Sequence, residues 1–367
     1  MREQFFSRRS FLAQTSCFGA AAAFARFFPT PAMAAHIQQD ARVAATPLLD
    51  KGFASTRKVG DGIYATIADT AKGFDALCNG GFIAGRDAAL LIEGHASPAG
   101  AALELEALRL VSPVPVRAAL DTHYHFDHSC GNSYYGGHGI PIMAHARCTS
   151  MIVEKYASLQ SGGDRALIAA YDEPLKNART ETEKQRAQGD LQAVQALLGT
   201  VMKSALTLPS QPLDPAKLPM KIDLGGVTAV IETHPGHTPT DIIVRVPEQN
   251  MAFTGDLVFN GSYPVTFDAN MTGWMKTLEA FSKWPKDTLL VPGHGAVCGL
   301  EVVEQERAIF ADLRNHAEKM LKAGVPWREA AQRYVVPPQF AKLGMFSWGF
   351  CVGGATAHFM DELKPKP

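Results

Sequence analysis

Residues 121–128 carry the side chains of this sequence that are best suited to bind metal ions. Three histidines and an aspartate fall within six residues, at His123, His125, Asp127 and His128. Imidazole nitrogens and carboxylate oxygens are zinc ligands, at about 2.0–2.2 Å. Alternate side chains of an extended segment share a face, so His123 and His125 can point at one ion. Asp127 and His128 follow the turn and can serve a second ion beside the first. The cluster predicts a site for two metal ions.

Three later segments each supply one more ligand. His237 follows an apolar run at residues 227–231, Asp256 follows a strand around residues 242–246, and His294 follows residues 288–291. In each case we expect a strand end, a glycine turn and then the ligand. Glycine lets the backbone bend sharply, so the side chain can be aimed at a point above the strands.

The order of these motifs resembles that of the metallo-β-lactamase superfamily. His-x-His-x-Asp-His is followed by Pro-Gly-His-Thr, Thr-Gly-Asp and Pro-Gly-His-Gly, and the resemblance covers roughly residues 57–300. It implies an α+β fold, the four-layer αβ/βα sandwich of that superfamily, with the metals at one edge between two sheets. The residue pattern alone would give only a mixture of α and β.

The resemblance also implies a ligand set and a cofactor. It assigns His123, His125 and His237 to a first zinc ion. It assigns Asp127, His128 and His294 to a second, with Asp256 bridging the two ions or favouring the second. Iron is the alternative metal, because a ligand set of His and Asp accepts it as well.

Two zinc ions held close together suggest hydrolysis. One zinc ion already lowers the pKa of a bound water to about 7, so a hydroxide is available at neutral pH. Our hypothesis is that this hydroxide attacks a carbonyl and opens an acyl bond. Asp127 would be the catalytic residue that holds the hydroxide and passes its proton on.

The substrate is a small molecule whose class the sequence restricts only in part. Many zinc β-lactamases have Cys or Ser where this chain has Asp256, and those with Cys tend to carry a Lys three residues on, where this chain has Phe259. A bridging Asp is typical of hydroxyacylglutathione hydrolases. We expect a β-lactam or a related cyclic amide or lactone as substrate, contacted by Asn260 and Tyr263. The alternatives are a thioesterase, a phosphodiesterase, an iron-dependent redox enzyme similar to persulfide dioxygenases, and a zinc-binding protein without catalysis.

The N-terminus reads as a targeting segment. Arg8 and Arg9 stand in a stretch that resembles a twin-arginine export signal, an apolar run continues to Phe28, and residues 31–34 form an A-x-A-like cleavage site. We expect residues 1–34 to be removed and the protein to work in the periplasm. The alternatives are a retained membrane anchor and a lipoprotein attached at Cys17.

Beyond the signal, we expect a catalytic domain at residues 35–310 and a C-terminal helical extension at residues 311–367. Residues 148–215 have helical spacing and read as an insertion within the catalytic domain. With 367 residues, 46% of them apolar, and a net charge of −1, the chain can bury a full core. That charge gives no basis for nucleic-acid binding. We expect no stable membrane association after cleavage, and the oligomeric state is left open.

The other histidines and the cysteines have structural roles in this interpretation. His95, His138, His145, His316 and His358 are interpreted as non-ligands. Cleavage would leave five cysteines, an odd number, so at least one thiol would be free or intermolecular. One of them, the cysteine two residues after His128, is expected to be a small buried thiol.

Overall fold

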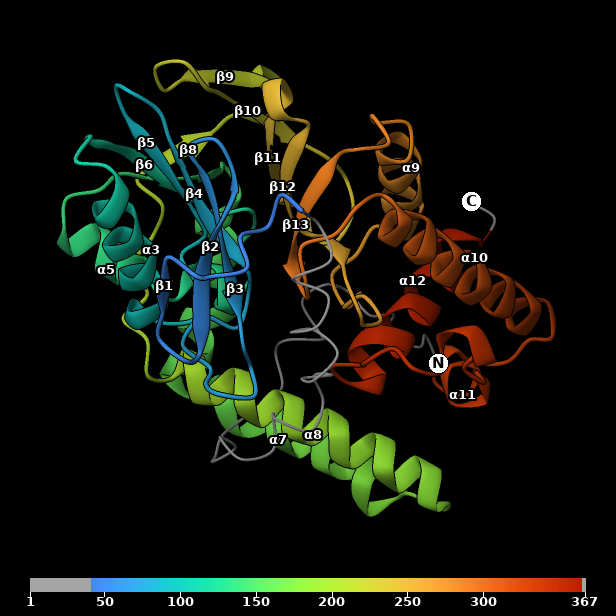
Figure 1. Ribbon diagram of the computed structural model, residues 1–367. Helices are drawn as coiled ribbons and strands as arrows, with labels where there is room; N and C mark the ends of the chain where they lie inside the picture. The colour runs from blue at the N-terminus through green and yellow to red at the C-terminus, as the bar shows by residue number, and fades with distance from the viewer. Residues whose placement is uncertain (1–40, 365–367) are drawn as a thin grey trace.

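The computed structural model describes residues 41–364, in which two β-sheets lie side by side with helices on their outer faces (Figure 1). The first sheet has eight strands in sequential order. They are β1 (Leu49–Asp50), β2 (Ala54–Gly60), β3 (Ile63–Ala68), β4 (Gly80–Ala84), β5 (Ala89–Ile92), β6 (Val116–Leu120), β7 (Ile142–His145) and β8 (Gln211–Leu213). Pairing is antiparallel from β1 to β5 and parallel from β5 to β8.

The second sheet has five strands in the order β13-β12-β11-β10-β9. Their bounds are β9 (Met220–Asp223), β10 (Thr228–Thr233), β11 (Ile242–Val246), β12 (Met251–Phe259) and β13 (Leu289–His294). Its strands pair antiparallel except for the parallel pair β12 and β13. All nine residues of β12 are buried, because this strand lies inside the sheet with both of its faces covered.

Helices cover the outer face of each sheet. On the first sheet these are α3 (Pro98–Val111) and α5 (Asn132–Gly137); on the second they are α9 (Met271–Phe281), α10 (Glu301–Lys322) and α12 (Gly354–Glu362) (Figure 1). Helix α3 begins after its N-cap Ser97, whose side chain accepts a hydrogen bond from the Ala99 N–H. The order helix, sheet, sheet, helix confirms the predicted four-layer αβ/βα sandwich.

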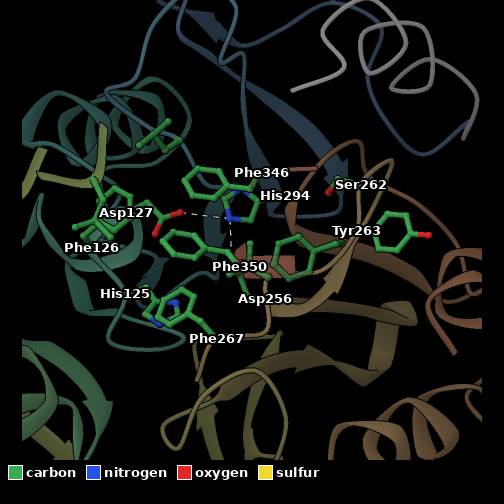
Figure 2. A pocket seen from close by; sticks show the side chains of 14 residues that line it. His125, Phe126, Asp127, Asp256, Ser262, Tyr263, Phe267, His294, Phe346 and Phe350 are labelled. Atoms are coloured by element: carbon green, nitrogen blue, oxygen red, sulfur yellow. Dashed lines mark ion pairs between the residues drawn. The ribbon is translucent and has the colours of Figure 1, made fainter. Parts of the chain in front are cut away.

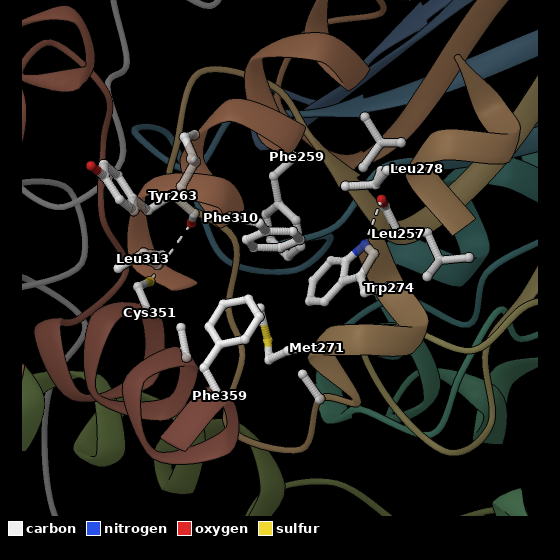
Figure 3. Close-up of a cluster of buried hydrophobic side chains, with 14 of the residues drawn as sticks. Leu257, Phe259, Tyr263, Met271, Trp274, Leu278, Phe310, Leu313, Cys351 and Phe359 are labelled. Carbon is white, nitrogen blue, oxygen red and sulfur yellow. Dashed lines mark hydrogen bonds between the residues drawn. The ribbon is translucent and has the colours of Figure 1, made fainter. Parts of the chain in front are cut away.

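The core between the two sheets consists of aliphatic side chains and one aromatic ring. Ile63, Leu90 and Leu120 come from the first sheet, and Val244 and Phe253 come from the second, all with at most 1% of their surface exposed. A second cluster joins the second sheet to the helices outside it, around Trp274 and Phe310 (Figure 3). Burial of this apolar surface holds the strand ends in fixed positions.

Residues 148–201 form a helical segment between β7 and β8. It consists of α6 (Cys148–Ile152), two π-helical turns η2 (Val153–Ala157) and η3 (Leu159–Gly163), α7 (Asp164–Lys176) and α8 (Glu181–Val201). Helix α8 begins with a capping box made by Thr180 and Glu183. The α7–α8 pair extends along one end of the molecule toward the C-terminal helices (Figure 1). The domain boundaries drawn from the sequence stay predictions.

The C-terminal part and the shorter helices complete the structure. After α10 come α11 (Trp327–Arg333), the 3-10 turn η6 (Pro338–Phe340) and the π-helical turn η7 (Gly349–Gly353), which leads into α12. Elsewhere lie α4 (Phe126–Ser129) and the 3-10 turns η4 (Pro215–Lys217) and η5 (Pro247–Gln249). Strands β1 and β2 and helices α4 and α5 have no distinct apolar period in the sequence that would predict them.

The export signal predicted at residues 1–34, with Arg8, Arg9 and Cys17, lies outside the described residues. Within residues 41–364, no helix combines the length and the apolar character needed to cross a membrane.

Candidate metal centre

Seven buried side chains converge at one edge of the sandwich, where strands of both sheets end. They fall into two groups, and within each group the candidate ligand atoms lie within 4.8 Å of one another. The first group is His123, His125, His237 and Asp256, and the second is Asp127, His128 and His294. These are the seven residues predicted from the motifs.

In the first group, three imidazole nitrogens point at one another. His125 Nδ1 lies 3.0 Å from His123 Nε2 and 2.9 Å from His237 Nε2. The three rings meet edge to face, with centroids 4.6–4.8 Å apart. Three nitrogens directed at a common point leave a position that a single cation can occupy.

Asp256 lies between the two groups. Its Oδ2 is 3.3 Å from His237 Nε2 and 3.4 Å from His294 Nε2, and its Oδ1 is 3.2 Å from His128 Nε2. Asp127 Oδ2 is 3.3 Å from the same nitrogen of His294 and 3.6 Å from that of His128. One carboxylate therefore faces both groups, as a bridging ligand would.

Strand ends and glycines position these side chains. His123 and His125 lie in the irregular segment directly after β6, and Asp127 and His128 lie in the short helix α4. His294 is the last residue of β13. Asp256 lies within β12, at a shift in the pairing with β13, and not after a strand as the motif suggested. Gly255, with a φ of +50°, produces this irregularity, because a left-handed backbone favours glycine.

Neighbouring groups hold the outer nitrogen of each first-group histidine. His123 Nδ1 lies 3.1 Å from Thr122 Oγ1, whose hydroxyl donates to Glu93 Oε1 at 2.5 Å. His237 Nδ1 donates to the Val265 carbonyl at 2.8 Å. Such contacts fix which nitrogen carries the proton and direct the other, unprotonated nitrogen inward.

The outer nitrogens of His125 and His128 face acidic or hydroxyl groups. His125 Nε2 is 3.1 Å from the Tyr124 hydroxyl and 3.6 Å from Asp268 Oδ2. Tyr124 and Lys155 both donate to Asp268, which places a buried ion pair behind this ligand. His128 Nδ1 is 3.1 Å from Glu93 Oε1.

The direction of the pKa shift differs between the histidines of the two groups. Burial and the neighbouring histidines lower the pKa of His123 and of His125 well below the usual value, and burial lowers that of His237 to about 4. These three are neutral at pH 7, as metal ligation requires. Although burial opposes it, the Asp256 carboxylate raises the pKa of His294 to about 10. The carboxylates therefore attract positive charge to the second group.

The donor set fits metal ions. Asp256 Oδ1 and both nitrogens of His128 are buried, and their close contacts with each other and with Glu93 do not have hydrogen-bond geometry. Leaving such groups unpaired costs about 1–3 kcal/mol each, and cations at the centre would satisfy the inward-facing atoms. His and Asp are donors for zinc and equally for iron.

The two predicted substrate contacts are placed differently. Tyr263 lines the cavity next to the metal centre, but its hydroxyl points away from it and lies 3.3 Å from that of Tyr334 (Figure 2). Asn260 is not among the residues that line this cavity, and its amide donates to the Ala296 carbonyl. The side-chain polar groups of both residues thus contact protein in this structure.

The histidines interpreted as non-ligands lie outside the two groups. His95 is buried and bonds with Glu104 at 2.8 Å, His145 accepts from the Arg147 N–H, and His138, His316 and His358 each pair with a backbone carbonyl. All five cysteines of the described part are free and buried. Burial raises the pKa of the Cys130 thiol to about 12, in keeping with a small apolar role.

Sequence reasoning missed Glu93, Asp268 and Phe267. Glu93 stands at the end of a buried strand run and has a left-handed φ of +88°, which the sequence does not show. Asp268 comes twelve residues after Asp256, in a loop without regular spacing. An acid directly after an apolar strand was the only available signal, and it applied to Glu93 alone.

Comparison with a family model gives a match to the metallo-beta-lactamase superfamily over residues 162–294. This range contains His237, Asp256 and His294, and it begins after the His-x-His-x-Asp-His motif.

Curated relatives match over shorter stretches. A hydroxyacylglutathione hydrolase of Hyphomonas neptunium is 33% identical over 119 residues, which are 32% of this chain and 44% of that protein. A metallo-beta-lactamase type 2 of Bacteroides fragilis is 35% identical over 78 residues, 20% of this chain and 31% of that protein. The chain thus spans less than half the length of the curated relatives it matches.

Solved structures with a similar arrangement include a metallo-beta-lactamase from Pontibacter korlensis, with 15% identity and a TM-score of 0.47, covering 73% of this chain and 98% of that one. Another is a metallo-beta-lactamase from Hirschia baltica, with 18% identity and a TM-score of 0.48, covering 70% and 97% of the two chains.

Proposed function

Because this chain belongs to the metallo-beta-lactamase superfamily, we propose that it is a dinuclear zinc hydrolase that opens an acyl bond. The observation that carries the proposal is the convergence of seven buried His and Asp side chains, with the nitrogens of the first group directed at one point and Asp256 facing both groups. In this proposal His123, His125 and His237 hold one ion and Asp127, His128 and His294 hold the other. Asp256 contacts both.

The bound ions supply a Lewis acid and a water whose pKa is lowered to about 7. The residues of the chain then move the proton and exclude bulk water. Asp127 is the catalytic residue in this proposal, because its carboxylate lines the cavity and lies 3.3 Å from His294 Nε2. From there it accepts a proton from the attacking water and returns it to the leaving group. Phe259 and Phe267 pack on the ligands His294 and His125 and keep bulk water from their faces.

The bond that is cleaved is proposed to be that of a β-lactam or of a related cyclic amide or lactone. Support comes from the ligand set and from the short match to a metallo-beta-lactamase type 2. A thioester is the second candidate, because the chain also resembles hydroxyacylglutathione hydrolases and carries Asp256 as the shared ligand. An iron-dependent redox enzyme would follow if iron proved to be the bound metal.

We also propose that the protein is exported to the periplasm through the twin-arginine route. The support is the Ser7–Arg8–Arg9 stretch and the Ala-Met-Ala sequence that ends at Ala34. Mass spectrometry of the protein recovered from the periplasm should give a chain that starts at Ala35. A full-length chain recovered only from the cytoplasm would contradict this proposal.

The test of the activity uses purified protein loaded with zinc and a panel of four substrates: a chromogenic cephalosporin, an acyl lactone, a thioester and a phosphodiester. Metal content is measured on the protein as purified. We expect turnover of at least one acyl substrate, and we expect Asp127→Ala to reduce kcat by a factor of at least 100. Turnover of no acyl substrate, or full activity in Asp127→Ala, would contradict the proposal.

A further inference from the structure

The cavity beside the metal centre has one polar side and one aromatic side. His125, Asp127, Asp256 and His294 form the polar side. Phe346 and Phe350 also line the cavity, and Figure 2 draws their rings close to His294 and Asp127. They belong to a C-terminal segment more than 50 residues beyond His294. On the proposed function, the reacting bond of a substrate faces the polar side, and an acyl chain attached to it can reach the aromatic side.

The aromatic side is a continuous set of packed rings. Phe346 stacks on Phe350 with centroids 5.6 Å apart and an interplanar angle of 15°. Phe350 packs against Phe267 at 5.1 Å, and Phe267 stacks on the ligand His125 at 4.9 Å. A rigid wall therefore runs from a metal ligand to the outer part of the cavity.

Helix α8 supports this wall from outside the sheets. Its Leu197 lines the cavity. Its Asp190 accepts from the Gly349 N–H at 2.7 Å, and the Arg186 guanidinium lies 3.3 Å from the ring centroid of Trp348. Two interactions thus fix the segment 346–350 to α8, so Phe346 and Phe350 are held in place before a substrate binds.

The charges of the cavity are negative or belong to imidazoles. Among the described residues that line it, none is Lys or Arg. The Lys155 ammonium lies behind the wall, bonded to Asp268 and 5.9 Å from the centroid of the Phe267 ring. Metal ions bound at the polar side would face the reacting bond, so a carboxylate at the far end of an acyl chain would contact the aromatic side. There it would lose its water and find no Lys or Arg among these lining residues, which disfavours binding.

We propose, on the basis of the proposed hydrolase function, that the cavity selects substrates whose acyl group is uncharged and apolar, and that Leu197, Phe346 and Phe350 determine this specificity. The wall gives binding energy in proportion to the apolar surface it covers.

The first experiment compares three 4-nitrophenyl esters on the zinc-loaded protein: acetate, hexanoate and the hemi-adipate, in which a carboxylate replaces the terminal methyl group of hexanoate. Each buried methylene contributes about 0.8 kcal/mol, about fourfold in kcat/KM, so we expect hexanoate to exceed acetate by at least tenfold after correction for the uncatalysed rates. Hexanoate should also exceed hemi-adipate by at least tenfold. Equal kcat/KM for hexanoate and hemi-adipate would overturn the inference.

Variants locate the effect. Phe346→Ala should reduce the ratio of kcat/KM for hexanoate to kcat/KM for acetate about tenfold. Phe346→Leu should retain most of this ratio. Phe346→Lys should have a higher kcat/KM for hemi-adipate than for hexanoate. Val335→Ala is the matched control, because Val335 lies in the same C-terminal segment with 80% of its surface exposed and does not line the cavity. Unchanged ratios in Phe346→Ala and Phe346→Lys, with melting curves like that of the unmodified protein, would overturn the assignment.

A binding measurement separates this inference from the proposed hydrolysis. NMR saturation transfer from the protein to hexanamide, and its absence for adipic acid monoamide, requires no turnover. If no ester is hydrolysed but hexanamide binds and Phe346→Ala abolishes the transfer, the selectivity stands and the proposed activity fails. If esters are hydrolysed but the two amides receive equal transfer, the activity stands and the selectivity fails.

Discussion

The side chains next to the seven candidate ligands orient the imidazole rings of these ligands. Glu93 is the acidic group shared by two of them, because it accepts from Thr122, which contacts His123, and faces His128 Nδ1 at 3.1 Å. Among the described residues, the partners of the outer nitrogens of these two histidines are a hydroxyl and a carboxylate. An anion in this position increases the basicity of an imidazole ligand.

We therefore predict that Glu93→Gln weakens zinc binding. The variant keeps an acceptor for Thr122 and loses the charge that faces His128, so the zinc affinity should fall about 10- to 100-fold. Competition with a chromophoric chelator measures it. Glu106→Gln is the control, because Glu106 is half-exposed and pairs only with Lys51 among the ion pairs described here. A zinc affinity in Glu93→Gln equal to that of the control would contradict the prediction.

The turns and helices around the centre leave little space beside the ligands. At Gly293 in β13, a Cβ atom would overlap Asp256 Oδ1. At Gly199, in helix α8, a Cβ atom would meet nothing within 4 Å. Gly293 must lack a side chain because the Asp256 carboxylate occupies the space beside it, whereas Gly199 has room for a methyl group.

We predict that Gly293→Ala displaces the Asp256 carboxylate and reduces the zinc content from two ions per chain to one or none. The reason is steric, since the added methyl group takes the place of an oxygen atom. Gly199→Ala is the matched control and should retain full zinc content, with a free energy of unfolding higher by about 0.5–1 kcal/mol. Atomic absorption after dialysis measures the metal. A zinc content of two ions per chain in Gly293→Ala would contradict the prediction, because the Asp256 carboxylate could then move without release of zinc.

Asp190 joins α8 to η7 through its hydrogen bond with Gly349. Burial raises the pKa of Asp190 to about 6, although the Gly349 N–H opposes the shift. The folded state therefore binds the proton more tightly than the unfolded chain, whose pKa is about 3.9. This contribution to stability is fully present below about pH 4 and is lost as the pH rises through 6.

The measurement is urea unfolding from pH 4 to pH 7 for the unmodified protein and for Asp190→Asn, which keeps an acceptor for Gly349. We expect the free energy of unfolding of the unmodified protein to fall by about 2–3 kcal/mol relative to the variant over this range. Glu173→Gln, at an exposed position of α7, should show no such pH-dependent difference. If the free energies of unfolding of Asp190→Asn and of the unmodified protein differed by the same amount at every pH, the raised pKa of Asp190 would be contradicted.

The molecule as a whole depends on the contact between its two sheets, because each sheet supplies part of the ligand set. Phe253 of β12 is the largest side chain in the cluster between the sheets and has 1% of its surface exposed. A Cβ atom added to Gly81 in β4 would come within 3.0 Å of its ring, so the ring reaches the first sheet.

We predict that Phe253→Ala lowers the free energy of unfolding by about 3–5 kcal/mol, because it leaves a cavity between the sheets. Denaturant unfolding of the zinc-free protein measures it without a contribution from the metal. The control Leu110→Ala removes a side chain on α3 that is 61% exposed, and it should change stability by less than about 0.5 kcal/mol. Similar losses in the two variants would show that the sheets do not depend on this contact.

The sequence by itself predicted the seven candidate ligands and several of the strands and helices. His, Asp and Gly at fixed spacing after apolar runs predicted all seven residues of the centre, because ligand chemistry and strand ends are local properties. The same runs predicted the strands that the structure has as β10, β11 and β13, and the helical spacing of residues 148–215 predicted α6, α7 and α8.

Only the tertiary structure decided what surrounds the centre. The residues around the centre are far from His123 in the chain: Glu93 is 30 residues away, and Asp268, Phe346 and Phe350 are more than 100 residues away. No local period connects them to it. Their places follow from the packing of the two sheets and of α8 against the C-terminal segment. Side-chain contacts across such distances depend on the whole fold, whereas the composition of a turn depends on its own residues.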